Sequence, residues 1–150
     1  MPHRGRTTAI LLATGAVGVV LLGVVSFRTE IRWFLQSDVE RIQGKWKVVS
    51  VIHGGQEDHH LRWNGLFFEG QTVTFQHPSQ NVMAAYQLVG KQKPPWLDIR
   101  SPDGTITQLI YDLERDRLTI CSKEAVPSER PTAFESRFGS HDRLYVLQRE

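Results

Sequence analysis

The chain has 150 residues and a net charge of +2, and the excess of positive charge comes from the arginines that flank an apolar N-terminal run. From residue 38 onward the net charge is −1, so this part has no basic stripe of the kind that nucleic-acid binding needs. A single cysteine, Cys121, excludes an internal disulfide and a zinc site built from several thiolates. We interpret Cys121 as a small apolar strand residue rather than a reactive thiol.

The N-terminal run Thr7–Phe27 has no charged residue over 21 positions, a length that spans about 30 Å of bilayer hydrocarbon as a helix. Arg4 and Arg6 precede it, which predicts a basic cytoplasmic N-terminus at 1–6 and an uncleaved signal-anchor helix at 7–27. A juxtamembrane linker at 28–37 and an extracytoplasmic domain at 38–150 then follow. A cleaved signal peptide is the alternative, and it would release the domain as a secreted or periplasmic protein.

A short helix is expected to open the domain. Ser37 can cap it and Glu40 holds the capping-box position, while Gly44 ends it. Beyond Gly44 the pattern changes to short runs of β-branched and aromatic residues separated by turn residues, which predicts strands. The predicted strands are Lys45–His53, Leu66–Phe68, Thr72–Gln76, Val82–Leu88, Trp96–Arg100, Ile106–Leu113, Arg117–Cys121, Thr132–Phe138 and Arg143–Arg149.

These strands predict an all-β fold, an antiparallel up-and-down barrel of about eight strands. No segment after Gly44 has a helical period long enough for a parallel crossover. Apolar and polar residues alternate in several runs, for example Val73 and Phe75 with Thr72, Thr74 and Gln76, as expected for one buried face. The first and last runs are long and apolar, and we expect them to pair, because closure removes both sheet edges.

Gly44-Lys45-Trp46 at the first predicted strand resembles the G-x-W signature of lipocalins. In that family the tryptophan plugs one end of the barrel and an arginine from a late strand lies against it. The resemblance implies that Gly44, Trp46 and Arg149 form this structural signature, with a cation–π contact between Arg149 and Trp46.

A narrower group resembles nearly all of residues 41–150: the lipocalin-like small domains of unknown function that are abundant in planctomycete bacteria. The resemblance implies a barrel and extracytoplasmic placement, with no established activity. Two segments depart from it, Asp58–Trp63 and Asn81–Met83, and if the barrel has a ligand mouth, these two loops are the most individual part of this protein. The matching pieces are Ile42–Ser50, Phe68–Thr74, Trp96–Ile99, Ile110–Leu113, Arg117–Cys121, Glu129–Phe134 and Leu147–Glu150.

No residue pattern predicts an enzyme. The candidate carboxylates Glu69, Asp98 and Asp112 lie in no recognised catalytic motif, and Gly54-Gly55 reads as a hairpin turn. Metal binding is not predicted either, because the histidines fall in or beside turns without zinc-ligand spacing. These are His53, His59, His60, His77 and His141. Arg130 is expected to pair with a nearby carboxylate, and Pro131 to start a strand.

We therefore expect a membrane-anchored domain, not an enzyme, that needs no cofactor and no metal and binds no nucleic acid. Its aromatic residues favour the binding of a small apolar or amphipathic ligand in the barrel, although the ligand-binding residues are not identified. The alternative is a solid-core envelope scaffold that binds another protein. The two differ in whether the lumen is open or filled.

Overall fold

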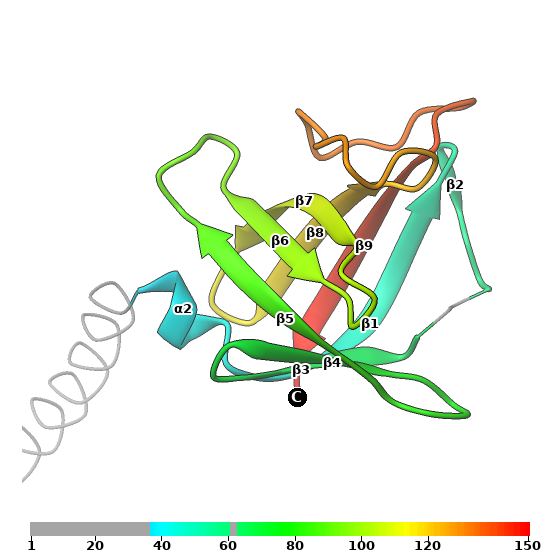
Figure 1. The fold of residues 1–150 in the computed structure, drawn as a ribbon. Coiled ribbons are helices and arrows are strands. Elements are labelled where there is room, and N and C mark those ends of the chain that lie inside the picture. The colour runs from blue at the N-terminus through cyan, green and yellow to red at the C-terminus, as the bar shows by residue number, and fades with distance from the viewer. Residues whose placement is uncertain (1–36, 61–62) are drawn as a thin grey trace, which may run out of the picture. The chain divides into compact units, whose positions relative to one another are not determined.

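The computed structural model describes residues 37–60 and 63–150 (Figure 1). The predicted segments 1–6, 7–27 and, apart from Ser37, 28–37 lie outside the described residues. In the described part, no helix has the length and apolar character to span a membrane. The elements are α2 (Asp38–Arg41), β1 (Gly44–His53), β2 (Gln56–Glu57), β3 (Gly65–Glu69), β4 (Thr72–Gln76), β5 (Val82–Val89), β6 (Trp96–Arg100), β7 (Ile106–Leu113), β8 (Arg117–Lys123) and β9 (Asp142–Arg149).

The long strands form one antiparallel sheet that closes on itself, in the order β1-β3-β4-β5-β6-β7-β8-β9 and back to β1. Closure is made by β1 and β9, which pair from Trp46 with Arg149 to His53 with Arg143. The short β2 only extends the end of β1. The structure thus confirms an antiparallel barrel of eight strands, with one extra strand and a short helix in front, and confirms the pairing of its first and last strands.

Because neighbouring strands run in opposite directions, the connections gather at the two ends of the barrel. We call one the α2 end, since α2 and the turns after β3, β5 and β7 lie there. The other is the strap end, named after the strap, the segment 124–141 between β8 and β9. Residues 58–60 and 63–64 and the connections 77–81 and 101–105 share the strap end.

The Trp46 side chain closes the α2 end. It is 0% exposed, and its indole nitrogen donates a hydrogen bond of 2.7 Å to the carbonyl oxygen of Ile42. The guanidinium of Arg149 lies 4.2 Å from the Trp46 ring centroid and donates to the carbonyl oxygens of Gln43 and Arg41. Gly44 has a φ of +104°, which favours glycine where the chain turns from α2 into β1. Gly44, Trp46 and Arg149 therefore lie together at the closed α2 end of the barrel.

Large side chains fill the lumen at the α2 end. Phe68 and Tyr86 meet edge to face with their centroids 5.0 Å apart. The Tyr111 hydroxyl donates a 2.7 Å hydrogen bond to Asp38 of α2. Around them pack the fully buried residues Ile42, Val73, Leu97, Leu118 and Leu147. This half of the barrel is a solid core.

The predicted strand Thr132–Phe138 is wrong, because this stretch forms part of the irregular strap. The reason is topological. β8 already pairs with β7 on one side and β9 on the other, so the barrel offers no free edge beside the strap. Pro131 accordingly starts no strand. Instead the strap lies against the outer face of β8, where Cys121 is buried with its sulfur 3.8 Å from the carbonyl oxygen of Glu135.

Candidate ligand pocket

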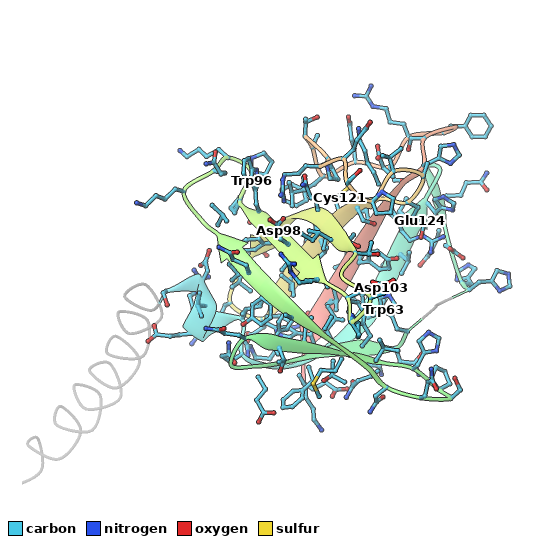
Figure 2. All side chains as sticks on the ribbon, in the orientation of Figure 1. Trp63, Trp96, Asp98, Asp103, Cys121 and Glu124 are labelled. Carbon is cyan, nitrogen blue, oxygen red and sulfur yellow. The ribbon has the colours of Figure 1, made fainter. Side chains whose placement is uncertain are left out.

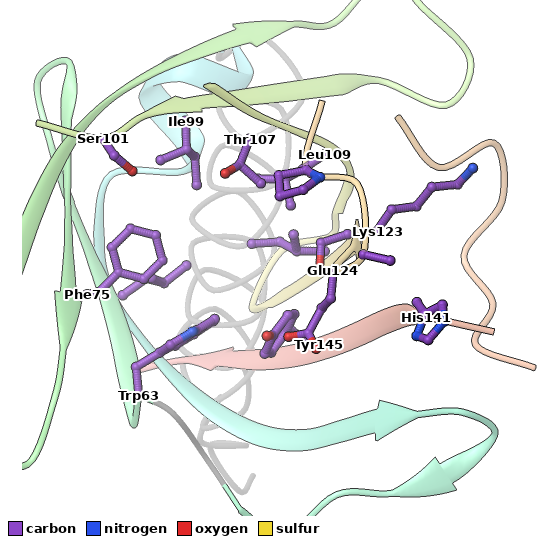
Figure 3. Close-up of a pocket in the computed structure, with 15 residues that line it drawn as sticks. Trp63, Phe75, Ile99, Ser101, Thr107, Leu109, Lys123, Glu124, His141 and Tyr145 are labelled. Atoms are coloured by element: carbon purple, nitrogen blue, oxygen red, sulfur yellow. The ribbon is translucent and has the colours of Figure 1, made fainter. Parts of the chain in front are cut away.

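The strap-end half of the lumen contains a cavity of about 590 Å³ (Figure 3). Four of its lining residues also belong to the buried core, namely Leu66, Ile99, Leu109 and Ile120, so the cavity reaches into the barrel interior. The others are Trp63, Phe75, Ser101, Thr107, Ser122, Lys123, Glu124, Ala125, Pro127, His141 and Tyr145. The lumen is thus filled at one end and open in the other half.

One wall of the cavity is aromatic. Trp63 stacks on Tyr145 of β9 with a centroid distance of 4.7 Å and an interplanar angle of 26°. Trp63 and Phe75 of β4 also form a T-shaped contact, with centroids 5.6 Å apart. Trp63 lies just before β3, within a segment that departs from the family resemblance. Flat rings held by neighbouring strands make a rigid apolar surface.

Hydroxyl groups also line the cavity. Those of Ser101 and Thr107 lie across it from the aromatic wall (Figure 3), whereas Ser122 is on β8, the strand that pairs with Tyr145's strand β9. Ser101 follows β6 and Thr107 lies on β7. Strand alternation explains their position, since Ser122 continues the inward series of Leu118 and Ile120. Serine and threonine thus take core-facing positions where each strand reaches the strap end.

A network of ion pairs lies beside the cavity. The side chain of Arg143 is only 7% exposed and pairs with Asp58 at 3.2 Å and with Glu124 at 2.9 Å. His53 lies within 3.4 Å of Arg143. A hydrogen bond from the backbone N–H of His60, assisted by the charge of Arg143, lowers the pKa of Asp58 below its usual value. The network ties the loop after β2 to the strap end of β9.

The strap supplies the wall formed by Ala125 and Pro127, and Arg130 fixes it from outside the barrel. Arg130 donates to the carbonyl oxygen of Leu109 and pairs with Asp98, and its guanidinium lies 4.3 Å from the Trp96 ring centroid. Trp96 and Asp98 lie together on β6 (Figure 2). The expected pairing of Arg130 with a carboxylate is therefore confirmed.

The residues singled out in the sequence have different positions. His141 lines the cavity and His53 joins the Arg143 network, whereas His59, His60 and His77 are exposed and line no part of it. No group of three or more metal-ligating side chains comes together in 37–60 and 63–150.

The three candidate carboxylates are not brought together by the fold. Asp98 pairs with Arg130 outside the barrel, Asp112 is exposed on β7, and Glu69 is exposed beside the turn after β3 at the α2 end. None of the three lines the cavity.

Sequence reasoning missed the hydroxyl side of the cavity. The signal was present, because Thr107 and Ser122 are polar residues at inward positions of strands that are otherwise apolar on that face. Polar residues at core positions are informative in this way.

Searches of known protein families, curated proteins and solved structures return no match to this chain.

Proposed function

We propose that the chain is a membrane-anchored, extracytoplasmic lipocalin-like domain that holds a small apolar or amphipathic molecule in the strap-end half of its barrel. The observation that carries this proposal is the cavity between the aromatic wall and the strap. Its volume of about 590 Å³ suits a small organic ligand, since such pockets typically enclose roughly 300–1,000 Å³. Placement of the domain in the planctomycete-abundant family is part of the proposal and rests on the sequence resemblance.

The scaffold alternative assumed a filled lumen. A small barrel with a solid core has side chains that fill its whole interior. In this barrel the α2 end alone is filled in this way. The strap-end half instead keeps an open volume with a mostly apolar lining and a few polar groups, which is the usual composition of a ligand site. Ligand binding is therefore the function that the geometry supports best.

Binding can be located with an uncharged photoreactive probe, an aryl-diazirine alcohol, added to the full-length chain in lipid nanodiscs. We expect the label on peptides that contain Trp63 or Tyr145. Ala125→Trp places an indole at the cavity and should abolish this labelling. Val126→Trp is the matched control, because Val126 is the exposed neighbour and does not line the cavity. Equal labelling in both variants, or no label on these peptides, contradicts the proposal.

Membrane anchoring rests on the uncharged run Thr7–Phe27 and the arginines before it. After alkaline extraction of membranes, the full-length chain should stay in the pellet, and protease added from outside should digest the domain. Release of the chain into the supernatant, with an N-terminal peptide that begins at Phe27, directly after Ser26, supports the cleaved alternative instead.

A further inference from the structure

The charged side chains around the cavity already have partners of opposite charge. Arg143 pairs with Asp58 and Glu124. Lys123 pairs with Glu129 at 3.0 Å, and Figure 3 shows its ammonium directed away from the aromatic wall. The histidine of the lining, His141, is exposed. A charged ligand group would have to break one of these pairs or enter without a partner, which is costly in an apolar site.

The hydroxyls, in contrast, are available. Within the described residues, the side chains of Ser101, Thr107 and Ser122 make no hydrogen bond with the protein. Ser122 is 7% exposed and still faces the cavity. None of the three hydroxyl oxygens is among the fully buried side-chain atoms that lack a hydrogen-bond partner, so each is accessible and can bond to a ligand in the cavity that it lines. A hydroxyl both donates and accepts, and it suits uncharged polar groups.

The aromatic wall favours a flat ligand. Trp63, Phe75 and Tyr145 hold flat ring surfaces that are already packed on one another. A planar ring gains offset-stacked or edge contacts on such a wall, beyond the gain from burial of its area.

We propose that the ligand is an uncharged amphipathic molecule with a flat ring body and a hydroxyl or carbonyl head group. The ring lies on Trp63, Phe75 and Tyr145, and the head group exchanges hydrogen bonds with Thr107, Ser122 and Ser101. The inference rests on the proposed ligand-binding function and specifies its chemistry. It excludes fatty acids and organic amines as the preferred class, because both are charged near neutral pH.

The test is competition against the photoreactive alcohol with compounds that share one naphthalene ring: 2-naphthylmethanol, 2-naphthoate, 2-naphthylmethylamine and 2-ethylnaphthalene. The full-length chain is used in nanodiscs at about pH 8. We expect naphthylmethanol to halve the labelling at a concentration at least about ten-fold lower than either ion. An ion that competes equally well overturns the proposal, while the labelling itself still supports ligand binding.

The hydroxyl contacts are tested by the double variant Thr107→Val and Ser122→Ala, which keeps the side-chain volumes close to the original. The potency of naphthylmethanol relative to ethylnaphthalene should fall by about three-fold or more, on the scale of one neutral hydrogen bond. Because the same potency ratio is compared between the variant and the unmodified chain, the partition of each compound into lipid cancels. Thr74→Val, on β4 and outside the cavity lining, is the control and should leave the ratio unchanged. An unchanged ratio in the double variant overturns the proposed head-group contact. Absence of labelling in the unmodified chain overturns the binding function itself.

Discussion

Trp46 combines complete burial, a hydrogen bond to Ile42 and the Arg149 contact at the α2 end. Trp46→Ala should therefore lower the free energy of unfolding by about 3–5 kcal/mol, the usual cost of removing a buried tryptophan. Urea unfolding followed by far-ultraviolet circular dichroism measures the change. Val49→Ala on the same strand is the control, because Val49 is exposed, and it should change stability little. An unchanged midpoint for Trp46→Ala contradicts its place in the core.

Asp58 predicts a pH dependence of stability. The His60 backbone N–H and Arg143 hold its folded pKa below 3.8, so the unfolded chain binds a proton more readily than the folded one. The contribution of Asp58 is thus complete well above the unfolded pKa of about 3.9 and is lost as the pH falls through the lower folded pKa.

In the Asp58→Asn variant the amide keeps the shape and an acceptor but removes the charge. Its urea midpoint should lie below that of the unmodified chain near pH 6, and the gap should close towards pH 3. Glu57→Gln, an exposed neighbour in β2, serves as control. A gap that stays constant with pH shows that the charge of Asp58 contributes nothing.

Among the elements, the strap depends on Arg130. Arg130→Met keeps the aliphatic stem but removes the donors to Asp98 and Leu109, and it should cost about 2 kcal/mol. Arg137→Met is the matched control, because the pair of Arg137 with Glu135 is exposed and should contribute about 0.5 kcal/mol or less. In the Arg130 variant, hydrogen exchange should be faster in the strap and at the Gln108 amide of β7, which donates to Pro127 of the strap. Equal effects of the two substitutions contradict an anchoring role for Arg130.

The strap also shows how far the sequence predicts this fold. Strands such as Thr72–Gln76 and Trp96–Arg100 have the predicted bounds, because alternation and turn residues are local signals. Thr132–Phe138 has similar local signals, yet whether a run becomes a strand also depends on a free edge, which only the closed topology decides. The residues that line the cavity could not be predicted for the same reason. Trp63 and Tyr145 are far apart in sequence, and only the barrel stacks them.

In the whole molecule, the two halves of the barrel have different roles: one supplies stability and the other leaves the lumen open. The α2 end has a filled core and a capped lumen, so it can supply most of the stability. The strap end leaves its lumen open and compensates with the Arg143 network and the Arg130 contact on the strap. A ligand that binds only the folded barrel would add stability at this end by mass action.

This division is testable with two phenylalanines on neighbouring strands. Phe68 is 1% exposed in the filled half, whereas Phe75 is half-buried and lines the cavity. Phe68→Ala should cost about 3–5 kcal/mol in urea unfolding, because it opens a void in close-packed surroundings. Phe75→Ala should cost about 1–2 kcal/mol, because part of its surface already faces open space. The photoreactive alcohol should respond in the opposite order, with weaker labelling in Phe75→Ala and unchanged labelling in folded Phe68→Ala. Equal stability costs, or weaker labelling in both variants, would show that the two halves do not act separately.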